Sequence, residues 1–116
     1  MDERLKKALD FSNYMQTLNN QKRLLLEKYQ DDLIYFYNGS QFTVTRELLT
    51  FVSAMIFNKH TEIVVVDSNN IPCCINDLSS FYNEILNTYT TASNEYYAEY
   101  DQLKKNRSVE KLVDYD

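Results

Sequence analysis

Both ends of the chain carry apolar residues at heptad spacing, which restricts each end to a long helix that pairs along one face. Over residues 2–29 neither Gly nor Pro interrupts the pattern, and Lys22 is the one polar residue at a core position. The apolar core positions are Ala8, Phe11, Met15, Leu18, Leu25 and Tyr29. A helix of that length measures about 42 Å, so it needs a second long helix from this chain or from a partner.

The last third of the chain repeats the pattern over residues 76–107, where Asn76 is expected to cap the helix. Glu99 is the polar exception in a stripe of Tyr82, Ile85, Tyr89, Ala92, Tyr96 and Leu103. Residues 1–30 hold six basic and four acidic side chains, whereas residues 76–116 hold four and eight. These opposite charge biases favour pairing of the two helices with each other. We expect the pair to form an antiparallel coiled-coil hairpin.

The middle of the chain changes to a β pattern. Two runs rich in aromatic and β-branched residues flank Asn38-Gly39, which predicts a β-hairpin with a type I′ turn. Thr45 is expected to cap a short helix over 46–57, which has almost no polar face and should therefore be largely buried. A second hairpin is expected over 62–75, and because of Pro72 its last strand should lie at an edge or be irregular at its start.

The sequence therefore predicts an α+β fold in which two long terminal helices flank two short β-hairpins with a short buried helix between them. We expect one domain over residues 1–116. Its parts are a helix over 2–29, a hairpin-helix-hairpin head over 31–75, a helix over 76–107 and a tail over 108–116.

Composition excludes several classes of function. The net charge of −5 and the pI near 4.8 argue against direct binding of nucleic acid or anionic membranes, which requires a surplus of Lys and Arg. The start of the chain has no apolar stretch of signal-peptide length, and no run of about 18 apolar residues occurs. We expect a cytoplasmic protein, located in the host cytoplasm or in the virion if the chain is viral.

Candidate reactive residues are few. His60 is the only histidine and lies in a polar loop, and adjacent Cys73 and Cys74 lack the spacing of a redox or zinc site. Glu95, Glu99 and Asp101 cluster in the last helix, where they form either an acid–base pair or, more simply, a solvated acidic face. A chain with one Gly also lacks the loops that cradle phosphates. We expect no enzyme, no cofactor and no metal site.

Aromatic residues of the last helix are candidates for binding a protein partner. Tyr89, Tyr96, Tyr97 and Tyr100 place rings on more than one side of that helix, so we expect some of them to contact another chain. Half-exposed packing against the first helix is the alternative. In the tail, Val109, Leu112 and Val113 have the spacing of a short helix that anchors in a groove, although they could equally continue the long helix.

The layout of long helices at both ends, with two hairpins and a short helix between them, is similar to that of the α-class subunits of prefoldin. That resemblance implies a co-chaperone whose coiled coils grip unfolded chains. In Met1–Lys7, Phe42–Leu48 and Lys104–Val109 the chain also resembles small uncharacterised proteins of tailed phages that infect marine bacteria. This second resemblance implies a role in the virion, in assembly or in host takeover.

Two functions follow as expectations. The first is a non-enzymatic interaction or assembly protein, expected to form a homo-oligomer, that self-associates through its helical hairpin or its sheet head. The second is a phage-type regulator that binds and inhibits a host enzyme or transcription component through its acidic, Tyr-rich helix. Both require protein partners.

Overall fold

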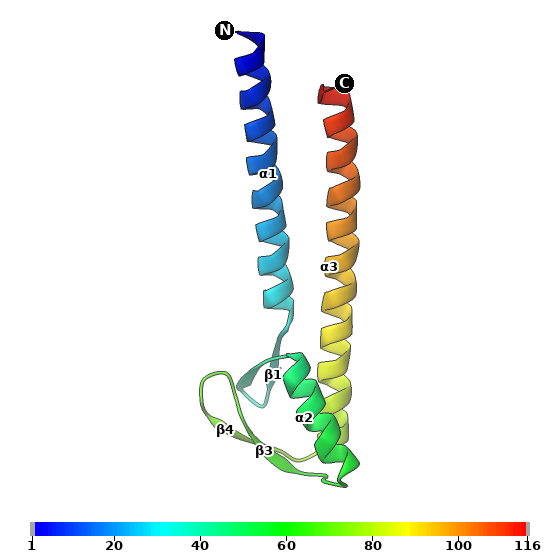
Figure 1. Ribbon diagram of the computed structural model, residues 1–116. Helices are drawn as coiled ribbons and strands as arrows, with labels where there is room; N and C mark the ends of the chain where they lie inside the picture. Colours follow the sequence, from blue (N-terminus) through cyan, green and yellow to red (C-terminus); the bar gives the residue numbers. More distant parts are fainter. Residues whose placement is uncertain (1, 116) are drawn as a thin grey trace. The chain divides into compact units, whose positions relative to one another are not determined.

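The computed structural model describes the backbone of residues 2–115 and the side chains of residues 2–106. Three helices and two antiparallel hairpins follow one another along the chain (Figure 1). The elements are α1 (Glu3–Asp32), β1 (Ile34–Tyr37), β2 (Ser40–Thr43), α2 (Arg46–Phe57), β3 (Ile63–Val66), β4 (Pro72–Ile75) and α3 (Leu78–Tyr115). The predicted α+β fold, with long terminal helices around two hairpins, is confirmed.

The chain divides into two compact units. The helical unit comprises Met1–Lys28 and Glu95–Asp116, and the mixed unit comprises Tyr29–Asn94. In the helical unit α1 and α3 run antiparallel, because Lys28 pairs with Glu95 and Glu99 while Lys22, earlier in α1, lies over the ring of Tyr100, later in α3.

The first hairpin of the mixed unit forms at the predicted turn. Asn38 and Gly39 have φ values of 47° and 82°, the two left-handed residues that a type I′ turn requires. The register pairs Ile34 with Thr43 and Tyr37 with Ser40. In the second hairpin Val66 pairs with Pro72, and because each sheet has only two strands, β4 keeps the open edge that its proline requires.

Helix α2 has local signals at both ends. The hydroxyl of Thr45 accepts the N–H of Leu48 at 3.1 Å, which confirms the predicted cap. At the other end Lys59 is left-handed, with φ 67°, and donates its N–H to Ile56 at 2.9 Å. His60 donates its N–H to the carbonyl of Met55 at 3.0 Å, which completes a Schellman motif.

The core of the mixed unit gathers around Phe81 of α3. Its ring lies 5.4 Å from that of Phe42 and 5.5 Å from that of Tyr37, both in edge-on geometry. The buried cluster is Phe42, Val44, Val52, Ile63, Cys73, Ile75, Leu78, Phe81 and Ile85. Each hairpin and each helix of this unit therefore contributes to one core.

The expectation that α2 is largely buried is wrong. Val52 is its one buried residue, and Phe51 and Phe57 are 47% and 86% exposed. A helix that is apolar on nearly all sides can still place only one face against a core, and the described residues do not cover the other face.

The predicted cap of α3 is corrected, and one of the two alternatives for the tail is observed. Asp77, not Asn76, caps the helix, since its carboxylate accepts the N–H of Ser80 at 3.1 Å. The side chain of Asn76 instead accepts the thiol of Cys74 at 3.4 Å. The backbone of α3 continues through Ser108 to Tyr115, so the tail extends the long helix.

Candidate protein-interaction surface

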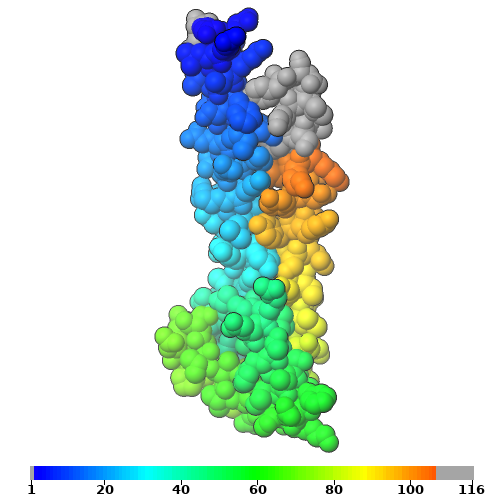
Figure 2. Space-filling model, viewed as in Figure 1, coloured from blue at the N-terminus to red at the C-terminus, as the bar shows by residue number. Residues whose placement is uncertain are grey.

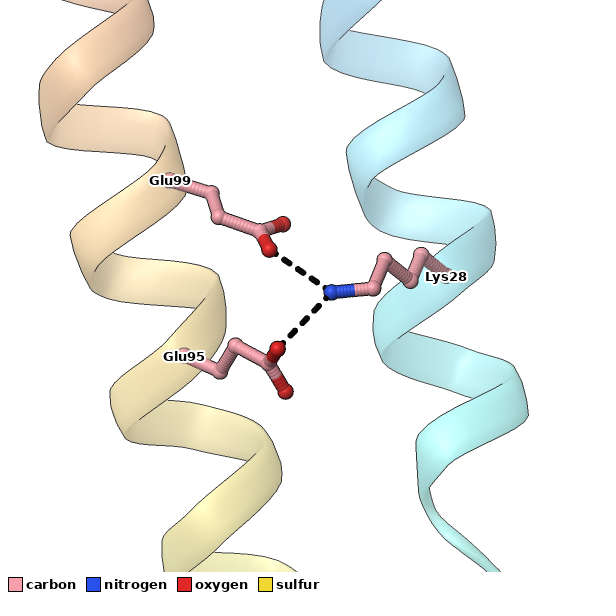
Figure 3. Close-up of polar contacts among 3 residues, drawn as sticks. All are labelled: Lys28, Glu95 and Glu99. Atoms are coloured by element: carbon pink, nitrogen blue, oxygen red, sulfur yellow. Dashed lines mark hydrogen bonds and ion pairs between the residues drawn. The ribbon is translucent and has the colours of Figure 1, made fainter.

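The helical unit is held by a three-residue ion cluster. Lys28 Nζ of α1 lies 2.7 Å from Glu99 Oε1 and 3.0 Å from Glu95 Oε1 of α3, so the ammonium lies between two carboxylates one helical turn apart (Figure 3). These hydrogen bonds, first with Glu99 and then with Glu95, raise the pKa of Lys28 above its usual range. Asp101 pairs with Lys105 at 2.9 Å. The predicted cluster of acidic residues is thus engaged in ion pairs within the chain.

The four tyrosines predicted to bind a partner occupy different environments. Tyr89 is half-buried against the core of the mixed unit. In the helical unit Tyr96 and Tyr100 are half-buried and meet edge-on, with ring centroids 6.1 Å apart, and Lys22 Nζ lies 5.7 Å from the Tyr100 centroid. Only Tyr97 is strongly exposed among these four, at 74%. The side chains of Val109, Leu112 and Val113 lie outside the described residues.

The contact face of α1 differs from the predicted register. Tyr14, Leu18, Gln21, Lys22 and Leu25 are the half-buried residues of α1 within the helical unit. Leu18, Lys22 and Leu25 were predicted there, but Tyr14 and Gln21 were not. Tyr14 and Gln21 each directly precede a predicted core position, so the contact face keeps part of the predicted register and is turned toward these two residues.

The rest of the α1 surface is rich in exposed large apolar side chains. Its exposed members are Leu5, Leu9, Phe11, Met15, Leu24 and Leu26, with exposed fractions of 36–55%. No described residue of the helical unit is buried. In Figure 2 the atoms of α1, blue to cyan, lie uncovered along the side that faces away from α3. An apolar surface of this kind is typical of a site that contacts another protein.

A second exposed apolar surface lies on the outer side of the β3–β4 hairpin. Val64 and Val66 are 64% and 58% exposed, and they pair across the strands with exposed Cys74 and Pro72. The opposite side of the same hairpin supplies Ile63, Cys73 and Ile75 to the core. This hairpin therefore has apolar residues on both sides, where a solvated sheet would alternate apolar and polar residues.

Asp67 has a structural role that was not predicted. The sequence predicted only that it lies in a turn. Asp67 is only 6% exposed. Its carboxylate accepts the N–H groups of Asn69 and Ile71, each at 2.9 Å, and that of Gln41 in β2 at 3.3 Å. These backbone hydrogen bonds, with that of Ile71 the largest, lower the pKa of Asp67. The Asp-Ser-Asn-Asn composition signals the local turn, but the bond to Gln41 has no local signal.

His60, Cys73 and Cys74, the residues considered for reactivity, all lie in the mixed unit. His60 is exposed and takes part in the α2 cap through its backbone. Cys73 is buried, and the Cys74 thiol donates to Glu62 at 3.2 Å, a hydrogen bond that raises the pKa of Cys74. Within the part of the chain that the structure describes, no three His, Cys, Asp or Glu side chains come together as metal ligands.

Among the described residues, none of the helices combines the length and the apolar character needed to cross a bilayer.

Comparison with known proteins finds no match. No protein-family model, no curated protein and no solved structure is similar to the chain.

Proposed function

We propose that this chain is a non-enzymatic protein-interaction protein that self-associates. One observation carries the proposal: the helical unit exposes six large apolar side chains on α1, and no described residue of that unit is buried. Two helices alone cannot enclose a core, so such a surface gains stability by packing against further helices. The exposed outer side of the β3–β4 hairpin supports the sheet head as the alternative surface.

The experiment measures mass in solution for the wild type and for two surface variants. Leu9→Glu with Met15→Glu places charge on the exposed side of α1, and Val64→Lys with Val66→Lys places it on the outer side of β3. Sedimentation equilibrium at micromolar concentration should give a multiple of the 13.8 kDa chain mass for the wild type. The variant that reduces the mass to that of one chain identifies the associating surface. A wild-type monomer would contradict the proposal.

A second candidate is a regulator that binds and inhibits an enzyme or a transcription component through α3. The observation in its favour is Tyr97, which projects a 74% exposed ring from an acidic part of that helix. Affinity capture with the wild type and with Tyr97→Ser tests it. A stoichiometric partner that the wild type retains and the Tyr97→Ser variant loses supports the regulator, whereas capture of only further copies of the chain contradicts it.

A further inference from the structure

The outer side of the β3–β4 hairpin is one exposed surface with an apolar centre and a single charge. Alternate residues of a strand lie on the same side of a sheet. The Cys74 thiol lies 3.2 Å from a carboxylate oxygen of Glu62 and 3.4 Å from the amide oxygen of Asn76, so these side chains extend the same surface. All of its members are exposed: Glu62, Val64, Val66, Pro72, Cys74 and Asn76.

The net negative charge of the protein resides in the mixed unit, which carries this hairpin. Residues 29–94 hold seven acidic and two basic side chains, a net charge of −5, whereas the rest of the chain holds ten of each. A second copy placed on the hairpin would bring two such negative units together, and like charges across an interface are unfavourable. A basic partner is instead attracted by the same field.

The edges of the hairpin do not favour the addition of a further strand. Pro72 in β4 has no N–H to donate to a neighbouring strand. Beside the end of β3, Ser68 donates its N–H to Gln41 at 2.8 Å and its hydroxyl accepts the N–H of Thr43 at 3.1 Å, so β2 occupies that position. A partner therefore gains most by covering the outer side.

The size of the outer side suits a short helix. Each strand has four residues, which makes it about 13 Å long and equal to about two and a half turns of α-helix. Helices cover the faces of sheets in this way in α+β folds. A helix with apolar residues on one side and basic residues beside them would match the two exposed valines and the one carboxylate.

We infer that the outer side of the β3–β4 hairpin docks a basic amphipathic helix of another protein. Apolar side chains of that helix cover Val64 and Val66, which are 64% and 58% exposed, and a Lys or Arg pairs with Glu62. The inference goes beyond the proposed self-association, because it concerns a different partner. Self-association through α1, in the helical unit whose charges balance, is compatible with it.

Peptide binding tests the inference with a designed probe. The probe is a helical peptide of about four turns, with Leu along one side and Lys on the other, and its matched control has Glu in place of each Lys. Nuclear magnetic resonance of the backbone amides locates the site during the titration. The Lys peptide should shift amides of β3 and β4 most, and the Glu peptide should not bind.

Three variants separate this surface from the overall charge. Glu62→Gln keeps an acceptor for the Cys74 thiol but removes the charge, so it should weaken binding of the Lys peptide about three- to fivefold at low ionic strength. Val64→Ser with Val66→Ser removes the apolar centre and should weaken binding about tenfold. Glu47→Gln, at an exposed site in α2, makes the same charge change in the same unit and should have little effect.

Binding of the Lys peptide that depends on Glu62 and on both valines supports the inference. Equal weakening by Glu62→Gln and Glu47→Gln would mean that only the net charge attracts the peptide, and it overturns the docking. Equal binding of the Glu peptide, amide shifts centred outside β3 and β4, or no binding overturns it as well. If Val64→Ser with Val66→Ser lowers the mass found by sedimentation, a second copy covers the hairpin, which overturns the inference and leaves self-association standing.

Discussion

The carboxylate of Asp67 accepts the backbone N–H of Gln41 across 3.3 Å, and this bond joins the turn of the second hairpin to the outer edge of the first. Next to it, Ser68 donates its N–H to the carbonyl of Gln41 at 2.8 Å. Together they satisfy polar groups of β2 that an edge strand would leave open to another chain. The two small sheets are therefore joined by hydrogen bonds from both Asp67 and Ser68.

Replacement of Asp67 by Asn should destabilise the mixed unit in a pH-dependent way. The folded state lowers the pKa of Asp67, so its stabilisation is present above the ordinary pKa of an aspartate and is lost as pH falls through the lowered value. At neutral pH we expect a thermal midpoint lower by about 5–10 °C. The difference from the wild type should shrink in acid. Asp10→Asn, at an exposed site in α1, is the control, and a constant difference across pH would show that the carboxylate charge is not the cause.

Truncation of Phe81 should be among the most damaging changes in the chain. Its ring is 1% exposed and contacts the rings of Tyr35, Tyr37 and Phe42. Phe81→Ala should lower the free energy of unfolding by about 3–5 kcal/mol, as measured by urea denaturation. Leu86→Ala, at a 37% exposed site in the same helix, should have a much smaller effect. Equal losses from both would mean that Phe81 is not the centre of the core.

Replacement of Lys59 by Gly should stabilise the protein. Lys59 adopts a left-handed conformation with φ 67° at the end of α2, where a side chain is unfavourable and glycine is common. We expect a gain of about 0.5–1 kcal/mol in the free energy of unfolding. Asn58→Gly, one residue earlier and with φ −83°, should instead be neutral or destabilising. A loss of stability in Lys59→Gly would refute the proposed strain.

Reversal of the charge on Lys28 should weaken the helical unit, because Lys28→Glu brings a third carboxylate to Glu95 and Glu99. The side chains are partly exposed, so we expect a modest fall in the thermal midpoint, about 5 °C at low ionic strength and less in high salt. The double variant Lys28→Glu with Glu99→Lys should recover part of it. If Lys104→Glu, which makes the same charge change elsewhere, has an equal effect, net charge and not this contact is responsible.

Local signals in the sequence predicted the elements well. Asn38-Gly39 determines its turn through the backbone freedom of two residues, and Thr45 caps α2 through a hydroxyl three residues before Leu48. The periodicity of the ends predicted two long helices, and their opposite charges predicted that they pair, as the ion pair between Lys28 and Glu99 shows.

Features that depend on distant residues were not predictable in the same way. Apolar composition suggested that α2 is buried, but burial depends on what surrounds a helix, and Phe57 is 86% exposed. The bond between Asp67 and Gln41 joins residues that are far apart in the sequence. The half-buried face of α1 includes Gln21 and excludes Met15, a difference that the apolar spacing of α1 alone did not predict.

The mass of the wild-type chain in solution, compared with that of Leu5→Glu/Leu26→Glu, tests the central claim most directly. Both leucines are exposed in the single chain, so the double variant should keep its fold and its circular dichroism. Sedimentation equilibrium at micromolar concentration should give a multiple of the 13.8 kDa chain mass for the wild type and 13.8 kDa for the variant. A wild-type mass of 13.8 kDa, or an unchanged mass in the variant, would contradict association through this face of α1.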